Sequence, residues 1–261
     1  MQFDDAIIGM LESIYQTKEA AARRQAVLAA LALKRGECTL DIGTGPGFVA
    51  LEMAMAVGIT GQVECIDTSE SMMSMAFKRC AGKPWTSFQI GNAAELPVSS
   101  NCCDAAAAIQ VLEFVPNVSR ALEELYRVLR PGGRAAIVST DWPSLVWNAS
   151  NMVRMAGVLD AFSEHCAHLA LPRSLAPLAR AAGFTVADRS ILPHFDAICA
   201  PGSFSALTAE LIASFVPGRR GVTGQDAAAW LADLRETAER GEAFFSLNQY
   251  LFLVEKPPLS A

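Results

Sequence analysis

The chain has 261 residues, of which 52% are hydrophobic and 18% are charged, and its formal net charge is −6. This composition allows one large domain, or one domain with a cap, around a sizeable core. The basic residues are scattered, with pairs such as Arg23-Arg24 as the longest runs, which argues against a nucleic-acid-binding face or a polybasic membrane anchor.

The cysteines and the N-terminus suggest a compartment. The first residues, MQFDD, lack a positive region followed by an apolar run, so we expect no signal peptide, and we expect no membrane span. The seven cysteines are odd in number and contain no C-x-x-C pair, which predicts free thiols in a reducing cytoplasm. Adjacent Cys102 and Cys103 are expected to be badly placed to chelate one ion together.

Two helices are expected first, over residues 3–15 and 19–33, and an alternation of strands and helices follows. Such an alternation implies a parallel sheet with right-handed crossovers. The expected strands are 38–42, 63–67, 85–90, 104–109 and 134–140, and the expected helices are 47–57, 70–80 and 118–129. The alanine-rich run 104–109 is a poor strand former, but a strand is the choice consistent with its neighbours.

In the second half of the chain, residues 144–170 and 172–182 are expected to be mainly helical. A further strand is expected to begin at 184–187, and 247–254 is expected to be the last strand. The segment 196–246 between them is far longer than a hairpin loop and carries helical patterns near 203–215 and 225–240. We therefore expect a helical insertion that serves as a lid.

The segment TLDIGTGPGFVA, residues 39–50, reads as a buried strand that ends at a glycine-rich turn and leads into a helix. Its glycines allow a ligand to approach the backbone closely. Asp41 opposes a phosphate at this place and suits a cationic amino-acid end. Phe48 stands where a dinucleotide fingerprint requires glycine, and the lysine of a P-loop is absent, so NAD and ATP fit poorly.

Polar residues also end the next three strands. Asp67 can accept hydrogen bonds from both ribose hydroxyls of an adenosine; the alternative, a helix cap, is already supplied by Ser69. Asn92 can meet an adenine amino group or act as a turn residue, and Gln110 can lie beside the amino-acid end of a ligand. Since the carboxyl ends of parallel strands share one edge of a sheet, these residues predict one ligand site.

Five pieces of sequence together resemble a class I S-adenosylmethionine (SAM)-dependent methyltransferase, and they cover roughly the first half of the chain. They are LDIGTGPG at 40–47, ID at 66–67, GNAAELP at 91–97, VLEFVP at 111–116 and ELYRVLRPGG at 124–133. They look like the domain shared by ubiquinone- and menaquinone-biosynthesis enzymes and natural-product small-molecule methyltransferases. The resemblance implies an α/β, Rossmann-like, doubly wound and mostly parallel seven-stranded sheet, with an antiparallel last strand and a helical cap or lid.

By this resemblance, the glycine loop packs against the methionine part of SAM, Asp41 holds its ammonium through water, and Asp67 binds the ribose. Asn92, where aspartate is common, and the backbone at Ala93 meet the adenine. For Arg24, a solvated helix face is the alternative to closing over the methionine end. The implied cofactor-binding residues are Tyr15, Arg24, Asp41, Gly43, Thr44, Gly45, Gly47, Asp67, Thr68, Asn92, Ala93 and Gln110.

The resulting division of the chain has five parts. These are N-terminal helices that close over the cofactor (1–35), the SAM-binding α/β core (36–140), acceptor-side helices with the sixth strand (141–195), the helical lid (196–246), and the last strand with the tail (247–261).

The expected activity is transfer of a methyl group from SAM to a small-molecule acceptor, which leaves S-adenosylhomocysteine. In-line displacement needs a closed, oriented site more than an acid or a base, although a base assists acidic acceptors. Candidate bases are Asp141, at the end of the fifth strand, and His165 and His168, which would share a helix face. The alternative for Asp141 is a turn residue, and the alternative for the two histidines is a plain surface or lid face. No metal is expected.

The acceptor is expected to be a hydrophobic or aromatic metabolite, methylated on oxygen, nitrogen or carbon. Alternatives are an arsenite methyltransferase that holds the metalloid with thiolates, and a non-catalytic SAM-binding module. An NAD-dependent oxidoreductase is opposed by Phe48 and Asp41. The expected state is a monomer or homodimer without a nucleic-acid partner.

Overall fold

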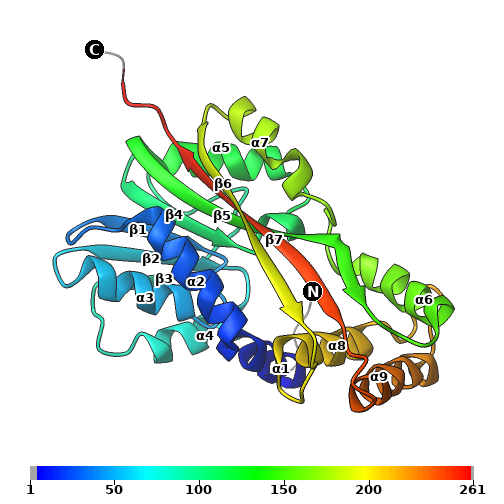
Figure 1. The fold of residues 1–261 in the computed structure, drawn as a ribbon. Coiled ribbons are helices and arrows are strands. Elements are labelled where there is room, and N and C mark those ends of the chain that lie inside the picture. The colour runs from blue at the N-terminus through cyan, green and yellow to red at the C-terminus, as the bar shows by residue number, and fades with distance from the viewer. Residues whose placement is uncertain (1–4, 260–261) are drawn as a thin grey trace. The chain divides into compact units, whose positions relative to one another are not determined.

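A computed structural model describes residues 5–259, which fall into two compact units (Figure 1). The α/β unit comprises Arg23–Thr140, Ala170–Leu192 and the chain from Gln249 onward. The helical unit comprises the chain up to Ala22, Asp141–Leu169 and Pro193–Asn248. The first residues of the helix expected over 3–15, and the last two residues of the expected tail, lie outside the described residues.

Seven strands form one sheet in the order β3-β2-β1-β4-β5-β7-β6, with β7 antiparallel. They are β1 (Cys38–Ile42), β2 (Gln62–Asp67), β3 (Thr86–Ile90), β4 (Cys103–Ile109), β5 (Leu129–Trp147), β6 (Thr185–Asp196) and β7 (Phe245–Glu255). The pairs β3–β2, β2–β1, β1–β4 and β4–β5 are parallel. This confirms the expected fold class, and the strand order reverses at β1 and β4, where open α/β sheets bind ligands.

The helices follow the predicted alternation. They are α1 (Asp5–Gln16), α2 (Lys18–Leu31), α3 (Phe48–Val57), α4 (Glu70–Arg79), α5 (Val118–Val128), α6 (Met152–Phe162), α7 (Pro172–Ala181), α8 (Phe204–Phe215) and α9 (Gly224–Glu239). Short 3₁₀ turns cover Leu112–Phe114 and Ser163–His165. Among residues 5–259, no helix has the length and apolar character that a membrane crossing requires.

The alanines of β4 explain how a poor strand former becomes a central strand. Ala106 and Ala108 belong to the core that α5 and α7 form on one face of the sheet, whereas Ala105 and Ala107 belong to the core under α2 and α3. Successive side chains in a strand point to opposite faces, so each alanine is covered by a helix. Burial on both faces therefore outweighs the intrinsic preference of alanine.

The expected helix over 144–170 is wrong at its beginning, because β5 continues to Trp147. The backbone N–H of Asn148 donates to the Phe244 carbonyl at 2.9 Å, and the Asn248 N–H donates to Ser144 Oγ at 2.9 Å. These partners lie about one hundred residues away in the chain, so local propensity cannot reveal them. Helix α6 starts only at Met152.

The helical unit has a core of its own, formed by α1, α6, α8 and α9 with the ends of β5 and β7. Trp230 is fully buried there, and its ring meets the ring of Trp147 edge-on at 5.5 Å. Its indole N–H donates to Met155 Sδ at 3.2 Å. Helices α8 and α9 agree with the patterns expected near 203–215 and 225–240.

Candidate functional site

The glycine loop joins β1 to α3 and is shaped by close packing. Gly43, Gly45 and Gly47 have φ values of 66°, 53° and 85°. A Cβ on Gly47 would stand 2.6 Å from Ala76 Cα, which belongs to the backbone of α4. A Cβ on Gly45 would meet only the Gly43 carbonyl, at 4.0 Å. The loop thus packs tightly against α4 at one end and leaves open space at Gly45, which allows a ligand to approach the backbone.

Asp41 lies beneath this loop and is only 2% exposed. Thr44 Oγ1 donates a hydrogen bond to its Oδ2 at 2.5 Å. Burial, opposed by the Thr44 hydrogen bond and assisted by repulsion from Asp67, raises the pKa of Asp41 to about 7. A nearby cation would favour the ionised carboxylate, whereas a phosphate would oppose it. The charge of the loop therefore fits a cationic ligand.

Asp67 connects the glycine loop to the end of β2. Its Oδ2 accepts a hydrogen bond from the Gly45 N–H at 2.8 Å, and its Oδ1 accepts from the Ser69 N–H at 2.9 Å. Ser69 Oγ accepts from the Met72 N–H at 3.3 Å, so Ser69 is the cap of α4, as the sequence predicted. Each carboxylate oxygen keeps a further lone pair, which can receive a ribose hydroxyl. Thr68, between them, is exposed.

Gln110 follows β4 with a φ of 54°, which is rare for a residue other than glycine. Its N–H donates to the Val138 carbonyl at 2.8 Å, and its side-chain amide donates to Thr140 Oγ1 at 3.0 Å. Thr140 Oγ1 also accepts from the Gln249 amide at 3.0 Å, and Arg23 donates to Gln249 Oε1 at 3.1 Å. This hydrogen-bond network holds Gln110 in its strained conformation.

Glu113 extends the network and is fully buried. It accepts hydrogen bonds from Ser139 Oγ at 3.1 Å and from the Thr140 N–H at 3.3 Å. Burial raises the pKa of Glu113 to about 7, against the effect of these hydrogen bonds. Sequence reasoning missed Thr140, Gln249 and Glu113. For Gln249 the sequence contains a signal, because alternation along the last strand places this polar residue on the same buried face as apolar residues. A buried polar side chain needs a hydrogen-bond partner.

Asn92 and Arg24 were each predicted with two alternative roles, and their contacts bear on both. Asn92 Oδ1 accepts from the Ala94 N–H at 2.9 Å, so Asn92 is a turn residue, and the neighbouring Ala93 is buried. Arg24 is buried, and its Nε donates to Glu52 Oε1 at 2.8 Å. A solvated helix face is therefore wrong for Arg24. Tyr15 lies on α1 in the helical unit.

The three candidate bases also belong to the helical unit. The expectation that His165 and His168 share a helix face is wrong, because His165 ends a 3₁₀ turn and His168 lies in an irregular segment. His165 stacks on Phe162 at 4.0 Å between ring centroids, and its Nδ1 lies 2.6 Å from the Phe162 carbonyl. Burial lowers the pKa of His165 to about 4, so its imidazole is neutral near pH 7. The Asp141 carbonyl accepts from Ser144 Oγ at 2.6 Å.

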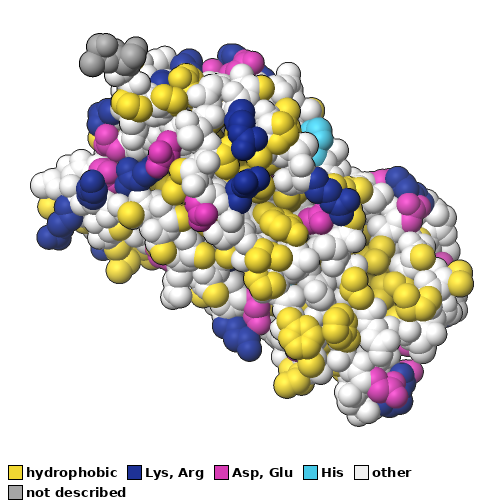
Figure 2. Space-filling view, turned by 45° about the horizontal axis from the view of Figure 1, so that its top comes forward, with side chains coloured by type: hydrophobic (Ala, Val, Ile, Leu, Met, Phe, Trp, Pro, Cys, Tyr) yellow, Lys and Arg dark blue, Asp and Glu magenta, His cyan; other side chains and the backbone are white. Residues whose placement is uncertain are grey.

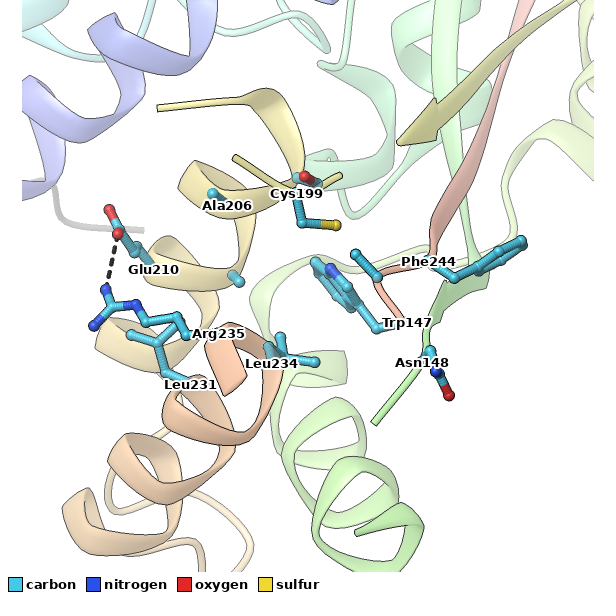
Figure 3. A pocket seen from close by; sticks show the side chains of 12 residues that line it. Trp147, Asn148, Cys199, Ala206, Glu210, Leu231, Leu234, Arg235 and Phe244 are labelled. Atoms are coloured by element: carbon cyan, nitrogen blue, oxygen red, sulfur yellow. Dashed lines mark hydrogen bonds and ion pairs between the residues drawn. The ribbon is translucent and has the colours of Figure 1, made fainter. Parts of the chain in front are cut away.

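A pocket in the helical unit contains none of these predicted residues (Figure 3). It holds about 400 Å³ of space, open solvent included, and Trp147, Phe244, Leu231 and Leu234 supply apolar walls. An ion pair between Glu210 and Arg235, at 3.0 Å, lies at one side. Within residues 5–259, no three His, Cys, Asp or Glu side chains gather in a way that could hold a metal ion.

Comparison with known proteins agrees with this geometry. Residues 40–137 match the methyltransferase domain family. A demethylmenaquinone methyltransferase of Oceanobacillus iheyensis is 31% identical over 138 residues, which are 52% of this chain and 58% of that protein. The chain spans about half the length of the curated relatives that it matches.

Solved structures share the fold at low sequence identity. A phosphoethanolamine N-methyltransferase 2 of Haemonchus contortus, in complex with S-adenosyl-L-methionine, has a TM-score of 0.64 and 19% identity, over 98% of this chain and 58% of that one. The [4+2]-cyclase SpnF has a TM-score of 0.61 and 23% identity, over 92% of this chain and 82% of that one. At these identities the similarity concerns the fold alone.

Proposed function

We propose, from the confirmed resemblance to class I SAM-dependent methyltransferases, that this chain transfers a methyl group from SAM to a small-molecule acceptor. The observation that carries the proposal is the pair of carboxylates, Asp41 and Asp67, at a glycine loop that is open at Gly45. A sulfonium cofactor with an ammonium and a ribose matches this set of groups. A dinucleotide phosphate does not match it.

The chain's own residues would hold and orient this cofactor. The loop from Gly43 to Gly47 would lie against the methionine part, and Asp41 would attract the ammonium through water. Asp67 would accept from the ribose hydroxyls with the lone pairs that Gly45 and Ser69 leave free. SAM, when bound, supplies the electrophilic methyl group. The remaining proposed contacts are those of Tyr15, Arg24, Thr44, Thr68, Asn92, Ala93 and Gln110.

We propose a hydrophobic or aromatic acceptor, selected by side chains of the helical unit, with methylation on oxygen, nitrogen or carbon. The demethylmenaquinone methyltransferase relative supports this class. On the face seen in Figure 2, Lys and Arg side chains lie interspersed with Asp and Glu. A continuous basic stripe, as nucleic-acid substrates require, is not seen on that face.

Asp141 and His168 are the better candidates for a base, because His165 is stacked in an apolar cluster. If a base assists, an Asp141→Asn or His168→Ala variant should lose about 10²-fold or more in kcat, with little change in the affinity for SAM. His165→Phe should keep activity within a few-fold. A large loss in kcat for His165→Phe alone, with an unchanged unfolding free energy, would instead assign the base to His165.

Calorimetry with SAM, S-adenosylhomocysteine and NAD tests the cofactor. We expect dissociation constants near the micromolar range for the first two, equivalent to about −8 kcal/mol, and no binding of NAD. NAD binding without SAM binding would overturn the proposal.

The reaction needs a separate test, because one structural neighbour is a cyclase. Incubation with SAM that carries a labelled methyl group, together with quinol, phenol and amine acceptors, should yield a labelled product and S-adenosylhomocysteine. Tight SAM binding with no labelled product from any of these acceptor classes would favour the non-catalytic SAM-binding module.

A further inference from the structure

Cys102 and Cys103, at the start of β4, place their sulfur atoms side by side. The two Sγ atoms are 3.6 Å apart. In a regular strand, successive side chains point to opposite faces. Here the pairing of β4 with β5 shifts between Cys103 and Ala105, and both cysteines pack into the core beneath α5. The two sulfur atoms are therefore closer together than the sequence alone indicates.

The separation of the sulfurs suits one bridging atom better than a disulfide bond. Two thiolates bound at about 2.3 Å to one centre stand roughly 3.4 Å apart when the centre is pyramidal and roughly 3.8 Å apart when it is tetrahedral, and the observed 3.6 Å lies between these values. A disulfide usually joins Cα atoms about 4.4–6.8 Å apart, whereas adjacent residues hold them at about 3.8 Å, so a disulfide between these neighbours would be strained. The geometry of Cys102 and Cys103 thus favours a chelate ring closed through a third atom.

The surroundings restrict what that atom can be. No third ligand completes a metal site in the part of the chain that the structure describes. Asp104, the next residue, is engaged by Arg130 at 2.6 Å and by the Cys38 N–H at 2.8 Å. Zinc, which takes four protein ligands in structural sites, lacks its ligand set here. A soft element that needs only two thiolates from the protein remains.

We propose that Cys102 and Cys103 form a binding site for a monosubstituted trivalent arsenical, a soft metalloid centre with two exchangeable positions. Cys102, which is partly exposed, reacts first, and Cys103, which is 1% exposed, closes the ring. Two arsenic–sulfur bonds form while the arsenic–oxygen bonds break. The two thiol protons leave with the oxygen as water, so no oxidant or reductant is needed.

The local environment agrees with this order of events. Cys102 Sγ donates to the Ser99 carbonyl at 2.9 Å, which holds the thiol beside its neighbour. Burial, assisted by the nearby Cys102, raises the pKa of the Cys103 thiol well above its usual value. Cys103 is therefore a weak nucleophile by itself, and it binds only after Cys102 has brought the arsenic beside it.

The dithiol site is separate from the proposed cofactor site and does not depend on methyl transfer. The cysteines begin β4, whereas Gln110 follows its end, and the seven residues of the strand span about 23 Å. An arsenical bound at Cys102 and Cys103 is thus far from the glycine loop and is not placed to accept a methyl group there.

Phenylarsine oxide is the probe, and intact-mass spectrometry of the reduced, folded full chain is the readout. We expect one phenylarsenic group per chain, bound with loss of two protein protons. The adduct should resist millimolar glutathione, a monothiol, and should be removed by the dithiol 2,3-dimercaptopropanol. Cys102→Ala and Cys103→Ala should each weaken binding by about 100-fold or more, because a chelate gains about 10²–10⁴ over a single bond.

The matched control is the double variant Cys166→Ala/Cys199→Ala, which removes two partly exposed thiols of the helical unit. It should bind the probe as the unmodified chain does. If Cys103→Ala does not fold, the Cys102→Ala variant and proteolytic mapping of the label to the fragment with residues 102–103 decide the outcome. Unchanged affinity in Cys102→Ala, or a label found only elsewhere, would overturn the proposal.

Discussion

The carboxylate of Asp67, at the end of β2, accepts a hydrogen bond from the backbone N–H of Gly45 at 2.8 Å. The group proposed to bind the ribose therefore also anchors the glycine loop. Since its second oxygen accepts from the Ser69 N–H, one side chain fixes the loop, the start of α4 and the sheet edge. The shape of the site and its chemistry consequently depend on the same residue.

Replacing Asp67 by asparagine should weaken both the anchoring of the glycine loop and the proposed binding of the ribose. The amide group turns one acceptor into a donor that faces a backbone N–H, and a hydrogen bond to a charged group contributes about 1.5–3 kcal/mol. We expect at least a tenfold loss in affinity for SAM and a drop in unfolding free energy, measured by calorimetry and urea unfolding. Asp188→Asn, on an exposed part of β6, is the control. Affinity within twofold of the original chain would contradict this role.

Alanine substitutions of the loop glycines should distinguish their role in packing from their role in letting a ligand approach the backbone. Gly47→Ala places its Cβ 2.6 Å from the backbone of Ala76, so we expect a loss of stability beyond the about 1–2 kcal/mol of a left-handed alanine. Gly45→Ala meets open space and should lower stability by that amount only, while it weakens SAM binding. Gly82→Ala, with φ +84° and no atom within 4 Å, measures the left-handed cost alone. Equal unfolding free energies for Gly47→Ala and Gly82→Ala would refute the packing argument.

We expect Thr140 to influence SAM affinity by holding the side chain of Gln110 in place. In Thr140→Val, the amides of Gln110 and Gln249 lose their shared acceptor, and each unsatisfied donor costs about 1–3 kcal/mol. Urea unfolding should show a larger loss than in Thr39→Val, where one hydroxyl bond of 3.2 Å is removed. Thr140→Ser, which keeps the hydroxyl, should restore stability and SAM affinity. A Thr140→Ser variant that is as destabilised as Thr140→Val would contradict the role of the hydroxyl group.

Glu113 should make stability depend on pH. Its pKa rises from the ordinary 4.5 to about 7 in the folded chain, because burial disfavours the charge. The contribution of Glu113 to the free energy of unfolding is fully present below pH 4.5, where Glu113 is protonated in both the folded and the unfolded chain. As pH rises towards 7, the unfolded chain ionises first, so the contribution falls by on the order of 3 kcal/mol.

The Glu113→Gln variant isolates this contribution, since a neutral amide of the same shape does not titrate. Urea unfolding at several pH values between 4.5 and 7 should show a smaller decline in stability for the variant. Part of the decline will remain, because burial shifts the pKa of Asp41 in the same direction. Parallel curves for the variant and the original chain would show that Glu113 is ionised in the folded state.

Much of the site could be predicted because it follows short-range rules. The strand–glycine–helix pattern around Asp41 and the cap at Ser69 are local, and the structure has both. The parallel order of the first strands brought Asp67 and Gln110 to the predicted edge. The extension of β5 and the irregular segment at His168 were missed, since they depend on partners elsewhere in the chain.

The sequence by itself determined the fold class and the character of the cofactor loop, because glycine conformations, strand-end polar residues and helix caps act within a few residues. Only the tertiary structure decided that Thr140 joins Gln110 to Gln249, and that Cys102 and Cys103 share a face. Those outcomes depend on the register between β4, β5 and β7. Register is set by burial and hydrogen bonds between strands distant in the chain, which local patterns do not encode.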